Sequence, residues 1–250
     1  MHDIYEQILV RLEHVVNLLA GRVSGPKLID FGSYYAFRHV EKSIHQAIVQ
    51  KLARMVSTLS AARLLLDHGF VQEQASLQRV LDEIQEDIIF LVFGILRGET
   101  ASPLHSEYLD SFFAEEFDAE TAIKSTQKRS MVPRRKIRSY LARNGFPPFD
   151  PSSSIELLRT MSKTYSGYVH AASPHIMDMY GGEPRRFHMR GMRGNPVYEG
   201  HREDLWNYFY RAISACAMSA KAFGDEELFD DYHVLLRQFE KASGKSFESA

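Results

Sequence analysis

Cysteine is nearly absent from this chain of 250 residues, and long apolar runs are missing. The one cysteine, Cys216, excludes an intramolecular disulfide framework and any cysteine-rich zinc module. The longest apolar run is Ile88 to Leu96, and its nine residues are too few to cross a bilayer. The first residues, Met1 to Glu6, lack the basic and apolar regions of a signal peptide. The sequence therefore predicts a cytoplasmic protein with no membrane contact.

Neither sign of charge dominates the chain. It has 30 Lys and Arg against 32 Asp and Glu, a formal charge of −2, so the overall charge favours no class of partner. Several signature motifs are also absent: the G-x-x-x-x-G-K-[ST] phosphate loop, G-x-G-x-x-G, G-x-S-x-G and H-E-x-x-H. These absences weigh against common nucleotide-binding folds and α/β hydrolases.

Apolar residues recur every three to four positions over most of the chain, which is the spacing of a buried helix face. The longest such pattern follows Gly32-Ser33 and is closed by Gly69, so we expect a helix over 33–68 with Ser33 as a possible N-cap. A strand is possible in the all-apolar run Ile88–Phe93, but the helical phase entering it favours a buried helix end. The other expected helices span 4–20, 71–97, 106–117, 118–127, 133–143, 154–169, 199–223 and 225–239.

These elements predict an all-α fold, a helical bundle in which helices 33–68 and 71–97 form a long antiparallel hairpin. Glycines and prolines interrupt residues 181–197, where we expect a short irregular or hairpin insert. A Pro-rich linker at 146–151 separates residues 1–145 from 152–250. We expect the two parts to share one core, as a single domain over 1–250.

Charge is unevenly distributed in the middle of the chain. Residues 106–123 contain six acidic and no basic residues, whereas residues 124–143 contain eight basic and no acidic ones. A second basic cluster lies in the irregular insert. The two segments could pair with each other, or the basic side chains could bind phosphate or nucleic acid. The candidates for phosphate or nucleic-acid binding are Arg134, Arg135, Lys136, Arg138, Arg185, Arg186 and Arg190.

Eleven histidines remain to be explained. His170, His175, His188 and His201 could in principle supply a zinc site. Their spacing matches no ligand pattern, so we predict no metal site and no cofactor. Ordinary surface or core histidines are the simpler interpretation.

Two Arg-x(4–6)-His pairs are present, Arg38 with His45 and Arg63 with His68. On a continuous helix, seven residues make almost two turns, so Arg38 and His45 would share a face. This motif resembles that of the higher-eukaryote-and-prokaryote nucleotide-binding (HEPN) superfamily of all-helical ribonucleases. The resemblance implies a His acting on the 2′-hydroxyl of RNA and an Arg holding the phosphate. Chance alone would produce about as many matches in a chain with this much Arg and His.

A second candidate set combines Arg79 and Glu83 on one helix with Tyr165 and His170 on a later one. The combination resembles a family of uncharacterised bacterial all-helical proteins, which implies a helical bundle but no established activity. If the four side chains met, the carboxylate would raise the pKa of the imidazole and Arg79 could hold an anion. Alternatively, Arg79 and Glu83 form an ordinary i,i+4 pair or belong to a buried network that fixes helix register.

Two functions of different classes fit these features. The first is a helical interaction or regulatory protein, a homo-oligomer or a binder of another protein. The alternative is a HEPN-like RNA-binding protein or metal-independent ribonuclease of a toxin or phage-defence type. A His-ligated metal hydrolase is a distant third.

Overall fold

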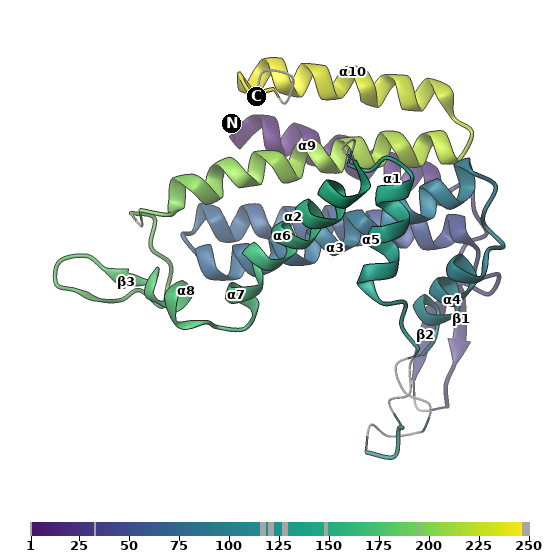
Figure 1. Cartoon of the computed structure of the whole chain (residues 1–250), viewed down its shortest axis with the longest axis horizontal. Coiled ribbons are helices and arrows are strands. Elements are labelled where there is room, and N and C mark those ends of the chain that lie inside the picture. The colour runs from purple at the N-terminus through teal and green to yellow at the C-terminus, as the bar shows by residue number, and fades with distance from the viewer. Residues whose placement is uncertain are drawn as a thin grey trace.

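The computed structural model consists largely of helices (Figure 1), which confirms the predicted all-α class. It describes residues 2–32, 34–115, 119, 123–126, 130–147, 150–194 and 196–246. Sheet structure in these residues is confined to two short two-stranded hairpins. None of the described helices is both long and apolar enough to span a lipid bilayer.

The long helices lie side by side and form the body of the molecule (Figure 1). They are α1 (His2–Ala20), α2 (Ile44–Asp67), α3 (Val71–Leu96), α9 (Tyr198–Ala222) and α10 (Glu226–Ser243). Helix α9 contacts each of the other four. The predicted antiparallel hairpin is confirmed for α2 and α3. They are joined at Gly69, whose φ of +78° is in the left-handed region that glycine adopts most easily.

The predicted helix over 33–68 begins too early. Helix α2 starts at Ile44, because Ser43 caps it: the Ser43 hydroxyl accepts from Gln46 N–H, and the Gln46 side chain accepts from Ser43 N–H. The preceding residues form antiparallel strands β1 (Lys27–Asp30) and β2 (Tyr35–Arg38). Ser33, the expected N-cap, lies outside the described residues.

Shorter elements connect α3 to α9 along the chain. They are α4 (Pro103–Phe112), α5 (Arg134–Arg143), α6 (Pro151–Thr164), α7 (Ser166–Val169), α8 (Ser173–Met177), β3 (Tyr180–Gly181) and β4 (Arg186–Phe187). The helix expected over 154–169 is broken at Tyr165, between α6 and α7. The expected 106–117 helix ends at Phe112, and most of the segment expected over 118–127 lies outside the described residues.

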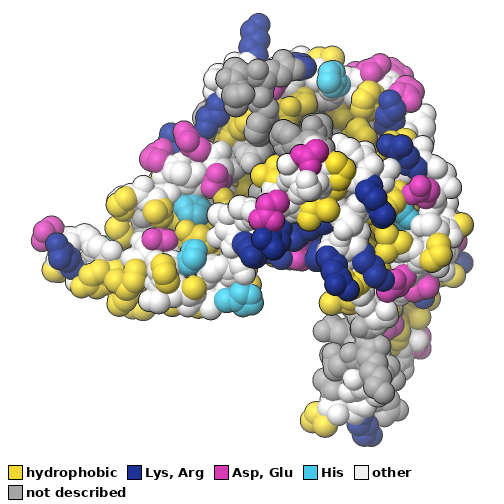
Figure 2. All heavy atoms as spheres, viewed as in Figure 1, with side chains coloured by type: hydrophobic (Ala, Val, Ile, Leu, Met, Phe, Trp, Pro, Cys, Tyr) yellow, Lys and Arg dark blue, Asp and Glu magenta, His cyan; other side chains and the backbone are white. Residues whose placement is uncertain are grey.

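The two hairpins project from the body as arms (Figure 1; Figure 2). The first arm consists of β1 and β2, and the second of residues 180–192, which contain β3, β4 and the turn between them. The second arm confirms the hairpin predicted near 181–197. It is attached to the α2–α3 turn, where Met192 N–H donates to the Gly69 carbonyl at 2.9 Å.

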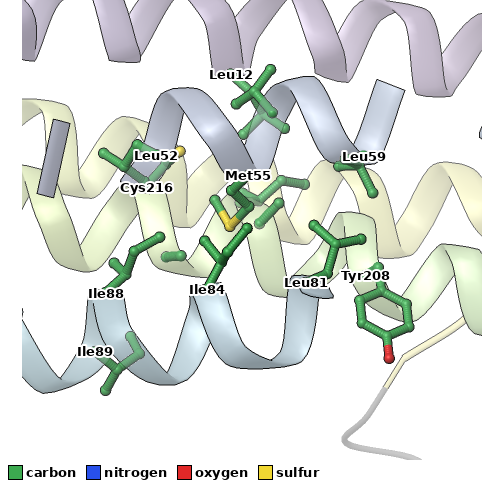
Figure 3. Close-up of a cluster of buried hydrophobic side chains, with 14 of the residues drawn as sticks. Leu12, Leu52, Met55, Leu59, Leu81, Ile84, Ile88, Ile89, Tyr208 and Cys216 are labelled. Carbon is green, nitrogen blue, oxygen red and sulfur yellow. The ribbon is translucent and has the colours of Figure 1, made fainter. Parts of the chain in front are cut away.

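The core lies between the long helices (Figure 3). Leu12, Leu52, Leu59 and Ile88 come from α1, α2 and α3 and are fully buried. Cys216 of α9 is buried among them, and burial raises the pKa of its thiol. This core also includes side chains from both sides of the 146–151 segment. The prediction of a single domain over 1–250 stays a prediction.

Candidate functional site

The four residues Arg79, Glu83, Tyr165 and His170 are only partly connected. Arg79 and Glu83 form an ion pair along α3, with Nη2 2.6 Å from Oε1. Tyr165 donates its hydroxyl hydrogen to Asp204 of α9. His170 is exposed just after α7, and no hydrogen bond or ion pair within the described chain joins its side chain to the other three.

Arg38 and His45 occupy different elements, so the shared helix face expected for them does not exist. Arg38 is on β2 and binds Glu115 with Nε and Nη2 at 2.7 and 2.8 Å. His45 is in the first turn of α2, and its ring meets Phe223 edge-on at 4.7 Å between centroids.

An ionic cluster forms where α5 crosses α3, and it contains several of the predicted residues. Arg134 forms a bidentate ion pair with Asp87, with Nη1 2.6 Å from Oδ1 and Nη2 3.2 Å from Oδ2. Arg138 binds Glu86 at 2.9 Å. Lys51 of α2 reaches the same Asp87 at 2.7 Å. Two residues proposed for phosphate binding, Arg134 and Arg138, thus bind carboxylates of α3.

Burial shapes the electrostatics of this cluster. Asp87 and Glu86 have side chains only 2% and 3% exposed. Burial raises the pKa of Glu86, although Arg138 and Arg134 act in the opposite direction. Ionised carboxylates at such depth require the neighbouring cations, so the cluster holds α5 and α2 in register on α3.

The expected pairing between the acidic and basic segments is therefore found only in part. Lys136 pairs with Glu107 of the acidic segment at 3.4 Å. Arg134 and Arg138 of α5 instead bind carboxylates of α3. Some members of the two segments lie outside the described residues: Glu116, Asp118, Glu120, Lys128 and Arg129.

A second polar cluster, the α3–α9 seam, was not expected from the sequence. His201 lies between Gln74 and Tyr168, with Nδ1 3.1 Å from Gln74 Oε1 and Nε2 3.2 Å from the Tyr168 hydroxyl. Further along, Asp82 accepts from the Tyr208 hydroxyl at 3.1 Å and from Arg211 Nη1 at 2.8 Å. The seam gives two core-facing helices a series of specific polar contacts, which fix their register.

The sequence does carry a signal for the seam. Gln74, Gln78 and Asp82 recur every four residues, so they line one face of α3 next to the apolar stripe. Gln78 is fully buried, and neither its amide nitrogen nor its oxygen has a hydrogen-bond partner in the described chain. Such groups cost stability unless a ligand or water satisfies them.

The remaining basic side chains are on the surface. Arg135, Lys136 and Arg143 of α5 are exposed, as are Arg185, Arg186 and Arg190 on the second arm. Figure 2 shows Lys and Arg side chains gathered above a notch between the two arms, over α5 and its neighbours. Unlike Arg134 and Arg138, these residues remain accessible to an anionic partner.

Both arms also expose large apolar side chains. On the first arm, Leu28 is opposite Phe37 and Tyr35 is on the same face, with 57%, 66% and 66% of their surfaces exposed. On the second arm, Tyr180 and Phe187 meet edge to face at 5.0 Å, and both rings are exposed.

In the described part of the chain, no three His, Cys, Asp or Glu side chains are grouped as ligands of a metal ion would be. The four histidines considered for zinc contact other groups of the protein, and His175 and His201 both lie against Tyr168. For example, His188 Nε2 lies 2.9 Å from the Gly181 carbonyl, and His175 stacks edge-on against Tyr168.

Comparison with known proteins gives no further assignment. No family model, curated protein or solved structure matches this chain.

Proposed function

We propose that this protein is a helical RNA-binding module that holds single-stranded RNA in the notch between its two arms. The observation that carries the proposal is the group of Lys and Arg side chains above this notch, together with the aromatic side chains that both hairpins expose. This proposal takes up the RNA-binding alternative expected from the sequence, and the interaction or regulatory role becomes the second candidate below.

The charge distribution fits a polyphosphate strand. Arg135, Lys136 and Arg143 are exposed on α5, and Arg185, Arg186 and Arg190 are exposed in and just after the β3–β4 hairpin. Spaced cations of this kind contact successive phosphates and displace their counterions, which is the main source of non-specific nucleic-acid affinity.

The aromatic side chains fit unstacked bases. Tyr35 and Phe37 project from the first arm, and Tyr180 and Phe187 from the second. Stacking of a base on such a ring contributes about 1–3 kcal/mol and tolerates any sequence. A purely apolar protein partner would require no basic surface beside these rings, so the mixture favours RNA.

The proposal does not include cleavage. Neither predicted set of His and Arg is assembled. Arg38 binds Glu115, and His45 contacts Phe223. No hydrogen bond in the described chain joins His170 to Arg79. The bacterial setting and the HEPN relationship implied by the sequence remain part of the proposal, as does a cytoplasmic location.

The test is fluorescence anisotropy with a labelled 20-nucleotide poly(U) strand. The double variant Arg135→Ser/Lys136→Ser should weaken binding at least tenfold. The control is Lys221→Ser/Lys241→Ser, which removes the same charge from α9 and α10 on another part of the surface. Equal affinities for both variants would refute the proposed surface.

A protein partner, including a second copy of this chain, is the second candidate. The exposed apolar face formed by Leu28, Tyr35 and Phe37 favours it, because a two-stranded hairpin alone is only marginally stable. Light scattering after size exclusion tests self-association directly. A dimer that Phe37→Ser converts to a monomer, together with no RNA binding, would replace the RNA proposal with this one.

A further inference from the structure

We propose that the cleft between α2, α4 and α5 is a second binding site, for a small organic acid that carries one negative charge on an apolar body. We call it the α4–α5 cleft. Its floor is formed by Lys51, Asp87 and Arg134, and its walls by Tyr108, Phe112 and Ile137. The site is separate from the exposed surface proposed for RNA.

The floor carries an excess positive charge. Asp87 is the shared partner of two cations, with Lys51 Nζ at 2.7 Å and Arg134 Nη1 at 2.6 Å. The adjacent carboxylates do not cancel the excess, because Glu83 is held by Arg79 at 2.6 Å and Glu86 by Arg138 at 2.9 Å. Lys51, Arg79, Arg134 and Arg138 thus face Glu83, Glu86 and Asp87, which leaves one positive charge over.

The donors on the floor are not all used. An ammonium group can donate three hydrogen bonds, and Lys51 donates one of them to Asp87. The hydroxyl of Tyr108, a residue only 7% exposed, has no hydrogen bond of normal geometry in the described chain. Burial and the nearby Asp87 carboxylate raise the pKa of this hydroxyl, so it keeps its hydrogen for an acceptor in the cleft. One carboxylate placed between Lys51 and Tyr108 would accept from both and neutralise the excess charge.

The walls suit an apolar body. The cleft has a volume of about 410 Å³, which is within the range of small-molecule sites. The rings of Tyr108 and Phe112 line one side, with Lys51 Nζ 5.0 Å from the Phe112 centroid. Val132 and Ile137 line the other side, and Met131, 73% exposed, stands at the rim. A planar aromatic acid matches this combination of a charged floor and apolar walls.

The experiment is isothermal titration with 1-naphthoate, and with 1-naphthamide as its uncharged counterpart. The naphthoate should bind the unmodified protein at least tenfold more tightly than the amide. Comparable affinities for the two compounds, or no saturable binding of naphthoate up to millimolar concentration, would overturn the proposal.

Two variants locate the binding. Tyr108→Phe removes only the hydroxyl and keeps the ring, so it should preserve the melting temperature and weaken naphthoate binding about tenfold. Lys51→Met should abolish the preference for the acid over the amide. Lys163→Met, an exposed lysine at the end of α6, is the matched control and should leave binding unchanged. Binding that survives both Tyr108→Phe and Lys51→Met would place the acid elsewhere and refute this site.

Competition by poly(U) would show that the cleft belongs to the RNA surface, which contradicts a separate site.

Discussion

His201 of α9 lies against Gln74 of α3, with Nδ1 of the ring 3.1 Å from Oε1 of the amide. The pair is buried, and the Tyr168 hydroxyl lies against the other ring nitrogen at 3.2 Å. These contacts place a titratable group inside the helix interface, so the stability of the interface depends on its protonation.

We expect the protein to lose stability below neutral pH because of His201. Burial lowers the pKa of His201 from its usual 6.5, against the opposing charges of Asp204 and Asp178. The unfolded chain then takes up a proton that the folded chain resists. Stability from this group is therefore present above pH 6.5 and is lost as the pH falls through the folded-state pKa. Burial also lowers the pKa of His105, so this residue adds to the loss of stability at low pH.

Thermal melts between pH 7.5 and 5 measure this effect. The variant His201→Gln should show a smaller fall in melting temperature with acidification than the unmodified protein, with the remaining fall due in part to His105. An unchanged slope would show that His201 is not the titrating group.

Replacing Gln78 with Met should stabilise the protein. Gln78 is fully buried and both polar atoms of its amide lack a partner in the described chain. Removing them should raise the free energy of unfolding by about 1 kcal/mol. Gln46 is the matched control: it is 1% exposed, but its amide binds Ser24, Glu41 and Ser43. Urea denaturation should show a loss of about 1 kcal/mol for Gln46→Met. Destabilisation by both substitutions would mean that Gln78 has a partner of its own.

Asp87 should contribute more to stability than a surface carboxylate. Asp87→Asn leaves Lys51 and Arg134 without their shared counter-charge, so we expect a loss of about 3 kcal/mol in urea denaturation. The control Glu107→Gln breaks the exposed pair with Lys136 and should cost less than about 0.5 kcal/mol. Similar losses for the two variants would contradict a stabilising role for the buried cluster.

Gly191→Ala should loosen the second arm. The φ of Gly191 is +86°, and an added Cβ would come within 2.2 Å of the His68 carbonyl oxygen. This position adjoins Met192, which attaches the arm to the α2–α3 turn. Limited trypsin digestion should cut after Arg185, Arg186 or Arg190 several times faster in the variant. Gly194→Ala, where nothing lies within 4 Å of the added Cβ, is the control. Equal rates in both variants would show that this attachment does not restrain the arm.

Periodicity alone predicts the long helices of the body, because their apolar stripes contact one another in the core. The helix boundaries are harder to predict, because neighbouring residues can favour a strand or a helix start over the same segment. Tyr35 to Arg38 alternate in a strand, yet the preceding Gly32-Ser33 resembles a helix start, and the true cap at Ser43 depends on its reciprocal bonds with Gln46.

The contacts between elements were harder to foresee. Arg134 and Glu83 belong to separate candidate sets in the sequence, but only the crossing of α5 over α3 brings them to within 3.7 Å of each other. The seam partners of Gln74 and Asp82 are more than 120 residues away along the chain. Such pairings are set by the packing of whole helices, which sequence spacing does not encode.

The salt dependence of RNA binding tests the central claim most directly. Titration of labelled poly(U) between 50 and 300 mM NaCl should give a linear fall of log affinity with log salt concentration. The slope should become shallower by about one for each phosphate contact removed in Arg135→Ser/Lys136→Ser, and should not change in Lys221→Ser/Lys241→Ser. Binding with no salt dependence, or no binding at 50 mM NaCl, would contradict the account.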